Sequence, residues 1–347
     1  MKFKAAILEN INKPLLIDEI ENDSLSEGQV LVKILQTGAC RSQIFEMEGK
    51  RGIDKYLPHL LGHEAIGIVI DLGEKVTKVK EGDYVVLSWI KSKGISAKPA
   101  KYFWKDKIVN SGQVTTFSEY SVCSENRCLR IEKELALKIG PTLGCALPTG
   151  YGLSLTQPEL KTAKYIAVVG LGGIGMAALL GALDQSKAEI FAIDINQIRL
   201  KEAKSLGAKY IFNPLETSTN IVDFLREKTN NKMIDLLLEC SGSIKVLNNS
   251  LKLINNLGLV KFVSHPKFGD LLEIDPFELI LGKRVEGSWG GGTYPDRDFE
   301  FIAKKISCNE KFMELYSNKI YELEEINLAL HELKSGKVLR PIINLTK

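Results

Sequence analysis

An apolar run followed by closely spaced glycines, at residues 165–183, limits what this chain can fold into more than any other feature. Residues 165–169 form an unbroken apolar stretch of the kind that is buried on both faces of a parallel sheet. Residues 170–175 then fit the pattern G-x-G-x-x-G, and a helix-like stretch follows at 176–183. In such a strand–turn–helix unit, the glycines permit a tight turn, the approach of backbone to a pyrophosphate, and the packing of helix on strand. The segment therefore predicts a parallel sheet that binds a dinucleotide.

The residues that follow this turn indicate which dinucleotide is bound. A lone glycine pattern is weak, but an acidic residue, Asp194, ends the next predicted strand at 189–194 and supplies the expected context. Its carboxylate can accept hydrogen bonds from the ribose hydroxyls, and its charge would repel a 2′-phosphate. No basic residue occupies the next two positions, and Arg199 further along is assigned to a solvated helix face. NAD is therefore favoured over NADP, and the residues predicted to bind it here are Gly170, Gly172, Gly173, Ile174, Gly175 and Asp194.

Other segments extend this sheet. Strands are predicted at 210–212, 234–239 and 259–263, with a spacing that supports a doubly wound sheet. By length alone, residues 166–183 could also suggest a membrane span. The five glycines in that stretch are better explained by the dinucleotide-binding turn, so we expect no membrane contact.

Length and composition exclude several classes of protein. A chain of 347 residues is long for one hydrophobic core and suits two domains. The net charge is only +3, so composition gives no argument for a nucleic-acid partner. The apolar stretch at the N-terminus is too short for a signal peptide, and six cysteines in a chain of this size do not indicate a disulfide framework. We expect a cytoplasmic protein.

Three residues far apart in the sequence, Cys40, His63 and Cys145, are candidate ligands of one metal ion. Cys40 follows a predicted strand at 28–34, His63 lies in a stretch of β-branched residues and glycines, and Cys145 lies in a glycine-rich turn before a helix. Ligands with this separation cannot form a local zinc knuckle, so the tertiary fold must assemble them. A single buried cysteine or histidine is more often inert packing. As a set, three protein ligands would leave a fourth position open for a substrate oxygen.

The segments around these residues resemble the zinc-containing medium-chain alcohol dehydrogenases. Residues 62–76 match the hallmark Gly-His-Glu-x₂-Gly-x₅-Gly-x₂-Val at every fixed position, and the resemblance runs over nearly the whole chain. It implies an α/β protein with a GroES-like, mainly-β catalytic domain at 1–150 and 289–347 and a doubly wound Rossmann domain with a parallel sheet at 151–288. The implied ligands of a single catalytic Zn²⁺ are Cys40, His63 and Cys145.

The resemblance assigns further residues to the reaction. Ser42 would take the alcohol proton and pass it toward the cofactor ribose, and Thr149 would contact the nicotinamide side. Glu64 would be a carboxylate that approaches the zinc, with an ordinary buried ion-pair partner as the equal alternative. Arg41 and Arg340 would bind the cofactor pyrophosphate, because a planar guanidinium can donate paired hydrogen bonds to phosphate oxygens. The alternative for each arginine is a surface position.

Three departures from the family pattern matter. The segment 88–112, which often carries four cysteines and a structural zinc, contains no cysteine, and Cys123 and Cys128 beyond it lack plausible partners. We therefore expect one zinc per subunit. Phe45 stands where some members have a histidine that relays the proton to solvent. Gln43 stands where an aspartate usually supports the zinc-bound histidine; its neutral amide can still accept a hydrogen bond from the imidazole but adds no charge.

A lysine-rich segment at 91–107 stands in place of the missing lobe. Its six lysines face a single acid, Asp106, with Tyr102, Phe103 and Trp104 in the middle. One interpretation is a basic rim that attracts a phosphorylated or nucleotide-linked sugar alcohol. The alternative, which we favour, is a solvated loop whose aromatic side chains pack into the subunit or its neighbour.

These features together predict a zinc-dependent alcohol dehydrogenase that transfers hydride reversibly between NAD and a secondary alcohol or polyol, with a ketone as the oxidised substrate. One alternative is a metal-free quinone or enone reductase of the same superfamily, although such relatives generally lack the ligand cysteines. The other is a non-catalytic, nucleotide-binding member. A homodimer or homotetramer is expected by resemblance alone, and fold-level analogy does not identify the substrate.

Overall fold

The computed structural model describes residues 1–317 and 319–346. The chain folds into two compact units. Unit 1 comprises Met1–Cys145 and Tyr294–Lys347, and unit 2 comprises Ala146–Thr293. Each unit has its own sheets and core, so the two are described separately.

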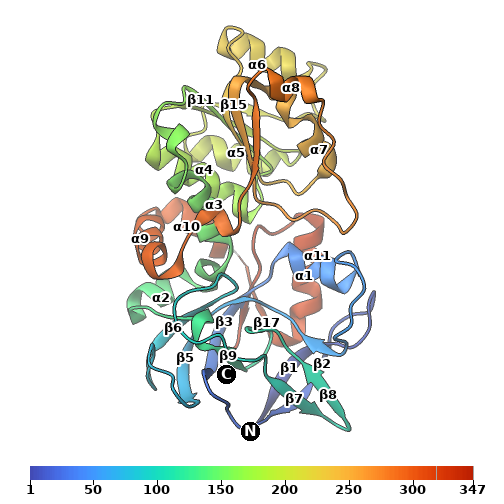
Figure 1. Cartoon of the computed structure of the whole chain (residues 1–347), viewed down its shortest axis with the longest axis vertical. Coiled ribbons are helices and arrows are strands. Elements are labelled where there is room, and N and C mark those ends of the chain that lie inside the picture. The colour runs from blue at the N-terminus through green and yellow to red at the C-terminus, as the bar shows by residue number, and fades with distance from the viewer. Residues whose placement is uncertain (318, 347) are drawn as a thin grey trace. The chain divides into compact units, whose positions relative to one another are not determined.

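Unit 2 is built on a parallel sheet with the strand order β13-β12-β11-β14-β15-β16, in which every neighbouring pair is parallel. Numbered from β11, this order is 3-2-1-4-5-6, which is that of a doubly wound dinucleotide-binding sheet. The predicted parallel sheet is thus confirmed, and Figure 1 labels β11 and β15 within it. The strands are β11 (Tyr165–Val169), β12 (Glu189–Ile193), β13 (Tyr210–Phe212), β14 (Ile234–Glu239), β15 (Ile254–Phe262) and β16 (Arg284–Gly287).

Helices connect these strands and begin at recognisable caps. The amide oxygen of Asn196 accepts hydrogen bonds at the start of α5, and that of Asn220 does so at the start of α6.

The apolar stretch 166–183 is divided between β11 and α4. Among the described residues, no helix has the length and apolar character needed to cross a membrane. The helices are α3 (Ala146–Leu155), α4 (Gly173–Gln185), α5 (Gln197–Leu206), α6 (Ile221–Thr229), α7 (Ile244–Asn249) and α8 (Pro276–Ile280).

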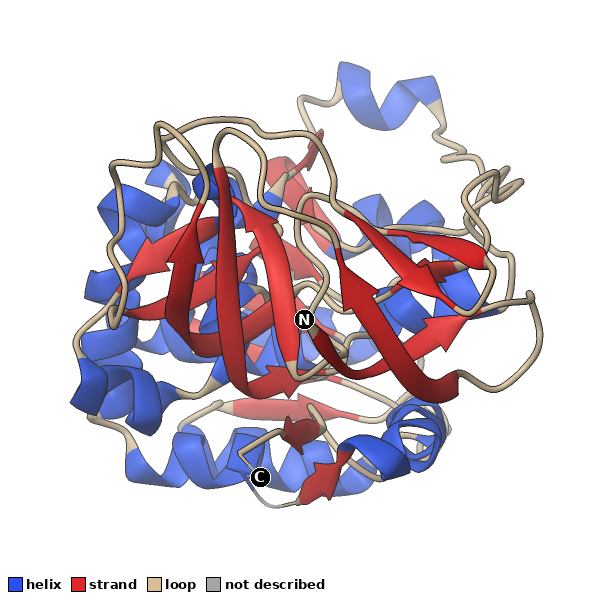
Figure 2. Cartoon of the chain, turned by 90° about the horizontal axis from the view of Figure 1, so that it is seen from below, coloured by secondary structure: helices blue, strands red, loops and turns tan. Residues whose placement is uncertain are grey.

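Unit 1 is mainly β, with a closed barrel and a second sheet (Figure 2). The barrel contains β1 (Lys2–Leu8), β2 (Leu16–Asn22), β7 (Lys101–Trp104), β8 (Lys107–Asn110) and β4 (His59–Leu60). The second sheet contains β10 (Cys128–Arg130), β6 (Tyr84–Ser88), β5 (Glu64–Leu72), β3 (Gln29–Gly38), β9 (Tyr120–Ser124), β18 (Ile342–Asn344) and β17 (Ile320–Glu322). The helices of unit 1 are α1 (Arg41–Met47), α2 (Lys133–Ile139), α9 (Pro295–Ser307), α10 (Glu310–Ser317) and α11 (Ile326–Ser335).

The last part of the lysine-rich segment, residues 101–107, lies in the β7–β8 hairpin of the barrel. Trp104 is buried, and its Nε1 donates a hydrogen bond of 2.8 Å to Asp18. Lys105 and Lys107 lie over the Trp104 ring and form ion pairs with Asp18 at 2.9 Å and with Glu9 at 2.7 Å. These contacts support the interpretation of a solvated hairpin whose aromatic side chain packs into its own subunit, because two of its lysines already have carboxylate partners.

Candidate functional site

Each of the three candidate metal ligands lies where a regular element of unit 1 begins or ends. Cys40 lies just beyond the end of β3 and is the N-cap residue of α1. His63 lies between β4 and β5, immediately before Glu64. Cys145 follows a short 3-10 helix at Pro141–Gly144. Antiparallel pairing of β3 with β5 brings the first two ligands together.

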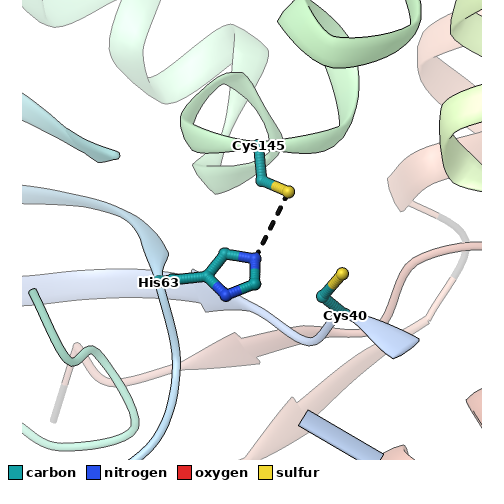
Figure 3. A group of neighbouring side chains, drawn as sticks. All are labelled: Cys40, His63 and Cys145. Atoms are coloured by element: carbon teal, nitrogen blue, oxygen red, sulfur yellow. Dashed lines mark hydrogen bonds between the residues drawn. The ribbon is translucent and has the colours of Figure 1, made fainter. Parts of the chain in front are cut away.

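The three ligand atoms converge. They all lie within 4.8 Å of one another, and the Nε2 of His63 is 3.3 Å from the Sγ of Cys145. Figure 3 shows the two sulfur atoms and the imidazole turned toward one another. Tetrahedral Zn²⁺, with Zn–S near 2.3 Å and Zn–N near 2.0–2.1 Å, would place such donor atoms about 3.5–3.8 Å apart. The donor set and its spacing therefore fit zinc.

The pKa values of the two thiols, Cys40 and Cys145, are shifted in opposite directions. The pKa of Cys40 is held well below its usual range, because Cys145 donates a hydrogen bond to it and the Arg340 guanidinium adds positive charge. The pKa of Cys145 is raised, since that thiol keeps the shared proton in its hydrogen bond to Cys40 and is buried. One sulfur is thus ready to bind a cation, and metal binding would release the remaining proton.

Gln43 supports this cluster in a different way from the one expected. Its Oε1 accepts a hydrogen bond of 2.6 Å from the backbone N–H of Cys40, and its Nε2 lies 2.6 Å from the Nδ1 of His63. The expectation that the amide accepts a hydrogen bond from the ring is wrong for this structure, because the amide NH₂ group, which is a donor, faces Nδ1. The amide oxygen instead holds the backbone of Cys40.

Glu64 and Arg340 form a buried ion pair beside the cluster. The Nε of Arg340 donates a hydrogen bond of 2.6 Å to Oε1 of Glu64, and both side chains are almost fully buried. For Glu64, this is the buried ion pair considered as an alternative above. For Arg340, the alternative of a surface position does not hold, because its side chain is buried. Glycines make room for the carboxylate, since a Cβ at Gly38 would lie 2.1 Å from Oε1 of Glu64 and one at Gly144 would lie 2.8 Å from its Cβ.

Several predicted site residues hold polar atoms that are not used within the chain. Among residues 1–317 and 319–346, the buried Ser42 Oγ, Thr149 Oγ1 and Arg340 Nη2 have no hydrogen-bond partner. Buried polar groups are nearly always paired, so each such atom indicates a ligand or water. Ser42 belongs to unit 1, like Cys40, and Thr149 lies on α3 of unit 2. Arg41, the first residue of α1, is exposed and available to an anion.

The glycine-rich turn of unit 2 has the geometry expected of a phosphate-binding loop. Gly170 has a φ of +83°, a conformation that favours glycine. A Cβ at Gly175 would lie 1.8 Å from the carbonyl oxygen of Gly170, so any larger residue would push α4 away from β11. Gly172 caps α4, and Gly173 and Ile174 form its first turn, whose N–H groups suit an anion.

Asp194 follows β12 and reaches back to this turn. Its carboxylate accepts the backbone N–H of Leu171 at 2.5 Å and that of Asn196 at 2.7 Å. Arg199, in the first turn of α5, has its Nη1 4.0 Å from the position of a Cβ at Gly172, and its side chain is partly exposed.

Cys123 and Cys128 lie on β9 and at the start of β10, and both are buried free thiols. Burial, with Cys123 as a neighbour, raises the pKa of Cys128 well above its usual range. Among the described residues, neither belongs to a group of side chains that could hold a metal ion.

Comparison with known proteins identifies the family. The model of the alcohol dehydrogenase GroES-like domain matches residues 26–133, and that of the zinc-binding dehydrogenase matches residues 173–305. The alcohol dehydrogenase class-2 isozyme 2 of Oryctolagus cuniculus is 30% identical over an alignment of 378 residues, which covers 99% of this chain and 98% of that protein.

Solved structures agree with this assignment. An alcohol dehydrogenase zinc-binding domain protein from Burkholderia ambifaria is 26% identical with a TM-score of 0.90, and each chain is covered completely. Benzyl alcohol dehydrogenase from Acinetobacter calcoaceticus is 25% identical with a TM-score of 0.87, and 99% of each chain is covered. The predicted combination of a GroES-like domain and a doubly wound Rossmann domain is confirmed. On its sequence relatives, its fold and its matching domains, this chain belongs to the zinc-type medium-chain dehydrogenase/reductase family.

Proposed function

We propose that this chain is a zinc- and NAD-dependent alcohol dehydrogenase that transfers hydride between NAD and a secondary alcohol or polyol, with the ketone in the reverse direction. The observation that carries the proposal is the convergence of Cys40, His63 and Cys145, whose ligand atoms lie within 4.8 Å of one another. Zn²⁺ at these ligands would act as a Lewis acid that lowers the pKa of the alcohol, and NAD would accept the hydride.

The side chains around the ligands suit this reaction. The buried Ser42 Oγ lies two residues from Cys40 and has no hydrogen-bond partner among the described residues. It is proposed to take the proton of the alcohol while passing its own proton on. Glu64 is held beside the cluster by its ion pair with Arg340. Thr149 is proposed to donate its unused hydroxyl proton to the nicotinamide carboxamide.

For the cofactor, the proposed ligands are the glycine turn at 170–175, Asp194 and the two arginines. The N–H groups at the start of α4 would bind the pyrophosphate. Arg41 is exposed, and Arg340 retains an unpaired Nη2, so both have donors left for phosphate oxygens. The carboxylate of Asp194 would accept the ribose hydroxyls.

Replacing Asp194 with alanine is expected to shift the ratio of kcat/KM for NAD over that for NADP toward NADP by at least about 10-fold. The change removes hydrogen bonds to the ribose and the charge that repels a 2′-phosphate, and a charged hydrogen bond contributes about 1.5–3 kcal/mol. Steady-state kinetics with both cofactors measure the ratio. Asp223→Ala on the exposed surface of α6 is the matched control. An unchanged ratio would refute the role given to Asp194.

The substrate class is tested by a screen that follows NADH absorbance with secondary alcohols and polyols, including phosphorylated and nucleotide-linked ones. Oxidation of such alcohols by zinc-loaded protein supports the proposal. Freshly purified protein that contains no zinc and reduces enones or quinones would favour the reductase instead. Protein that binds NADH but oxidises nothing would favour a non-catalytic member. Assembly as a homodimer or homotetramer and a cytoplasmic location stay predictions.

A further inference from the structure

A glutamate shares one face of α1 with Ser42. Glu46 lies four residues after Ser42, so their Cβ atoms are about 5–6 Å apart on the helix surface. The Glu46 side chain is partly buried but keeps 29% of its surface exposed. A carboxylate here can therefore face both the buried hydroxyl of Ser42 and bulk water.

Glu46 lies close enough to the candidate metal ligands to feel their charges. Its carboxylate interacts electrostatically with His63, Arg51, His59 and Cys40. Burial raises the pKa of Glu46 and outweighs the lowering by the basic neighbours. A carboxyl with a raised pKa exchanges protons more readily near neutral pH than an ordinary glutamate.

No structural role occupies this carboxylate. Within the described ranges, 1–317 and 319–346, its one ion pair is a long contact of 3.9 Å from Oε1 to Nη2 of Arg51, and its oxygens accept no hydrogen bond. By contrast, Glu48 on the same segment forms ion pairs with Lys50 and Lys334. Glu46 is thus a half-buried carboxylate beside the site whose hydrogen-bonding capacity is unused.

The other nearby groups are unsuited to carry a proton outward. Phe45 has no titratable atom. Each ring nitrogen of His59 faces an oxygen acceptor, Nε2 toward Asp54 at 2.8 Å and Nδ1 toward the carbonyl of Leu60 at 2.9 Å. Both ring nitrogens are thus already engaged in hydrogen bonds within the chain.

We propose that Glu46 is the proton-relay residue of this site, linking Ser42 to solvent. The inference rests on the proposed dehydrogenase function. In alcohol oxidation the C–H bond would break, and its hydrogen would leave with both electrons as hydride to NAD⁺. The O–H bond also breaks, and its proton passes to Ser42 Oγ while the Ser42 proton passes through one water to the Glu46 carboxylate. Glu46 then returns to the carboxylate by releasing that proton to bulk water.

The test compares wild type with Glu46→Gln in the full, zinc-loaded chain. We expect Glu46→Gln to lower kcat for alcohol oxidation about 100-fold at neutral pH, with KM, zinc content and NADH affinity unchanged. The loss should shrink as pH rises, because hydroxide can then accept the proton. Glu46→Asp, which keeps a carboxyl, should recover most of the rate. Glu48→Gln, the matched control, should leave kcat unchanged.

An infrared titration of the resting protein gives a readout besides turnover. Wild type should show a protonated carboxyl band that persists above the ordinary glutamate range, and Glu46→Gln should lack it. An unchanged kcat, a loss that is equal at all pH values, or the same infrared band in both proteins would overturn the relay. A wild-type protein that oxidises no alcohol would overturn the dehydrogenase proposal and this inference with it, so the two failures are distinguishable.

Discussion

Replacing Cys145 with serine is expected to remove zinc and to lower kcat by more than ~100-fold. Loss of a residue that only hydrogen-bonds a metal ligand already costs up to ~100-fold in activity, and Cys145 is proposed to be a ligand itself. A thiolate is a strong zinc ligand, whereas a serine hydroxyl stays protonated near neutral pH and binds Zn²⁺ weakly. NADH affinity should change little, because the glycine turn belongs to unit 2 and Cys145 to unit 1. Metal analysis, a fluorescence titration with NADH and steady-state kinetics measure the three quantities.

Cys308→Ser is the matched control for this change. Cys308 is an exposed free thiol whose Sγ donates to the carbonyl oxygen of Lys304. Its replacement should leave zinc content and kcat as in wild type. If Cys145→Ser kept full activity without zinc, the mechanism centred on the metal would be wrong.

Replacing Arg340 with methionine should lower the free energy of unfolding by about 3–5 kcal/mol. The change leaves the fully buried Glu64 carboxylate without its guanidinium partner, and an uncompensated buried charge costs several kcal/mol. Equilibrium unfolding in urea, without NAD, measures the loss. Cofactor is left out because Arg340 is also a proposed pyrophosphate ligand.

An exposed arginine provides the comparison. Arg226 lies 3.7 Å from Asp223 on α6, and more than half of each side chain is exposed. Exposed pairs contribute about 0–1 kcal/mol, so Arg226→Met should change the free energy of unfolding by less than 1 kcal/mol. If Arg340→Met and Arg226→Met lowered the free energy of unfolding equally, burial would not be the reason why the Glu64–Arg340 pair stabilises the protein.

The parallel sheet of unit 2 was predictable because its pattern is local. Apolar runs gave β11 and β14 with correct bounds, and the glycine spacing located the turn before α4. β15 begins five residues earlier than predicted, at Ile254. Its first half contains two asparagines, and Leu257 has a φ of +73°, so neither an apolar run nor regular strand geometry marks it in the sequence.

The set of Cys40, His63 and Cys145 was predictable only through the family hallmark, and details of its surroundings were not. The pairing of Glu64 with Arg340 joins residues 276 positions apart, which no local pattern reveals. The orientation of Gln43 depends on its contacts with two residues, Cys40 through the amide oxygen and His63 through the amide nitrogen. Such choices are decided by tertiary contacts, whereas strand and turn positions are decided by local sequence.

The most direct test of the account is the dependence of alcohol oxidation on bound metal. Protein stripped with a chelator and reloaded with known amounts of Zn²⁺ is assayed for NADH formation with an alcohol found in the substrate screen. We expect a rate that rises in proportion to zinc and saturates at about one ion per chain, as for one open three-ligand site. Full activity in the metal-free protein would contradict a mechanism that depends on zinc.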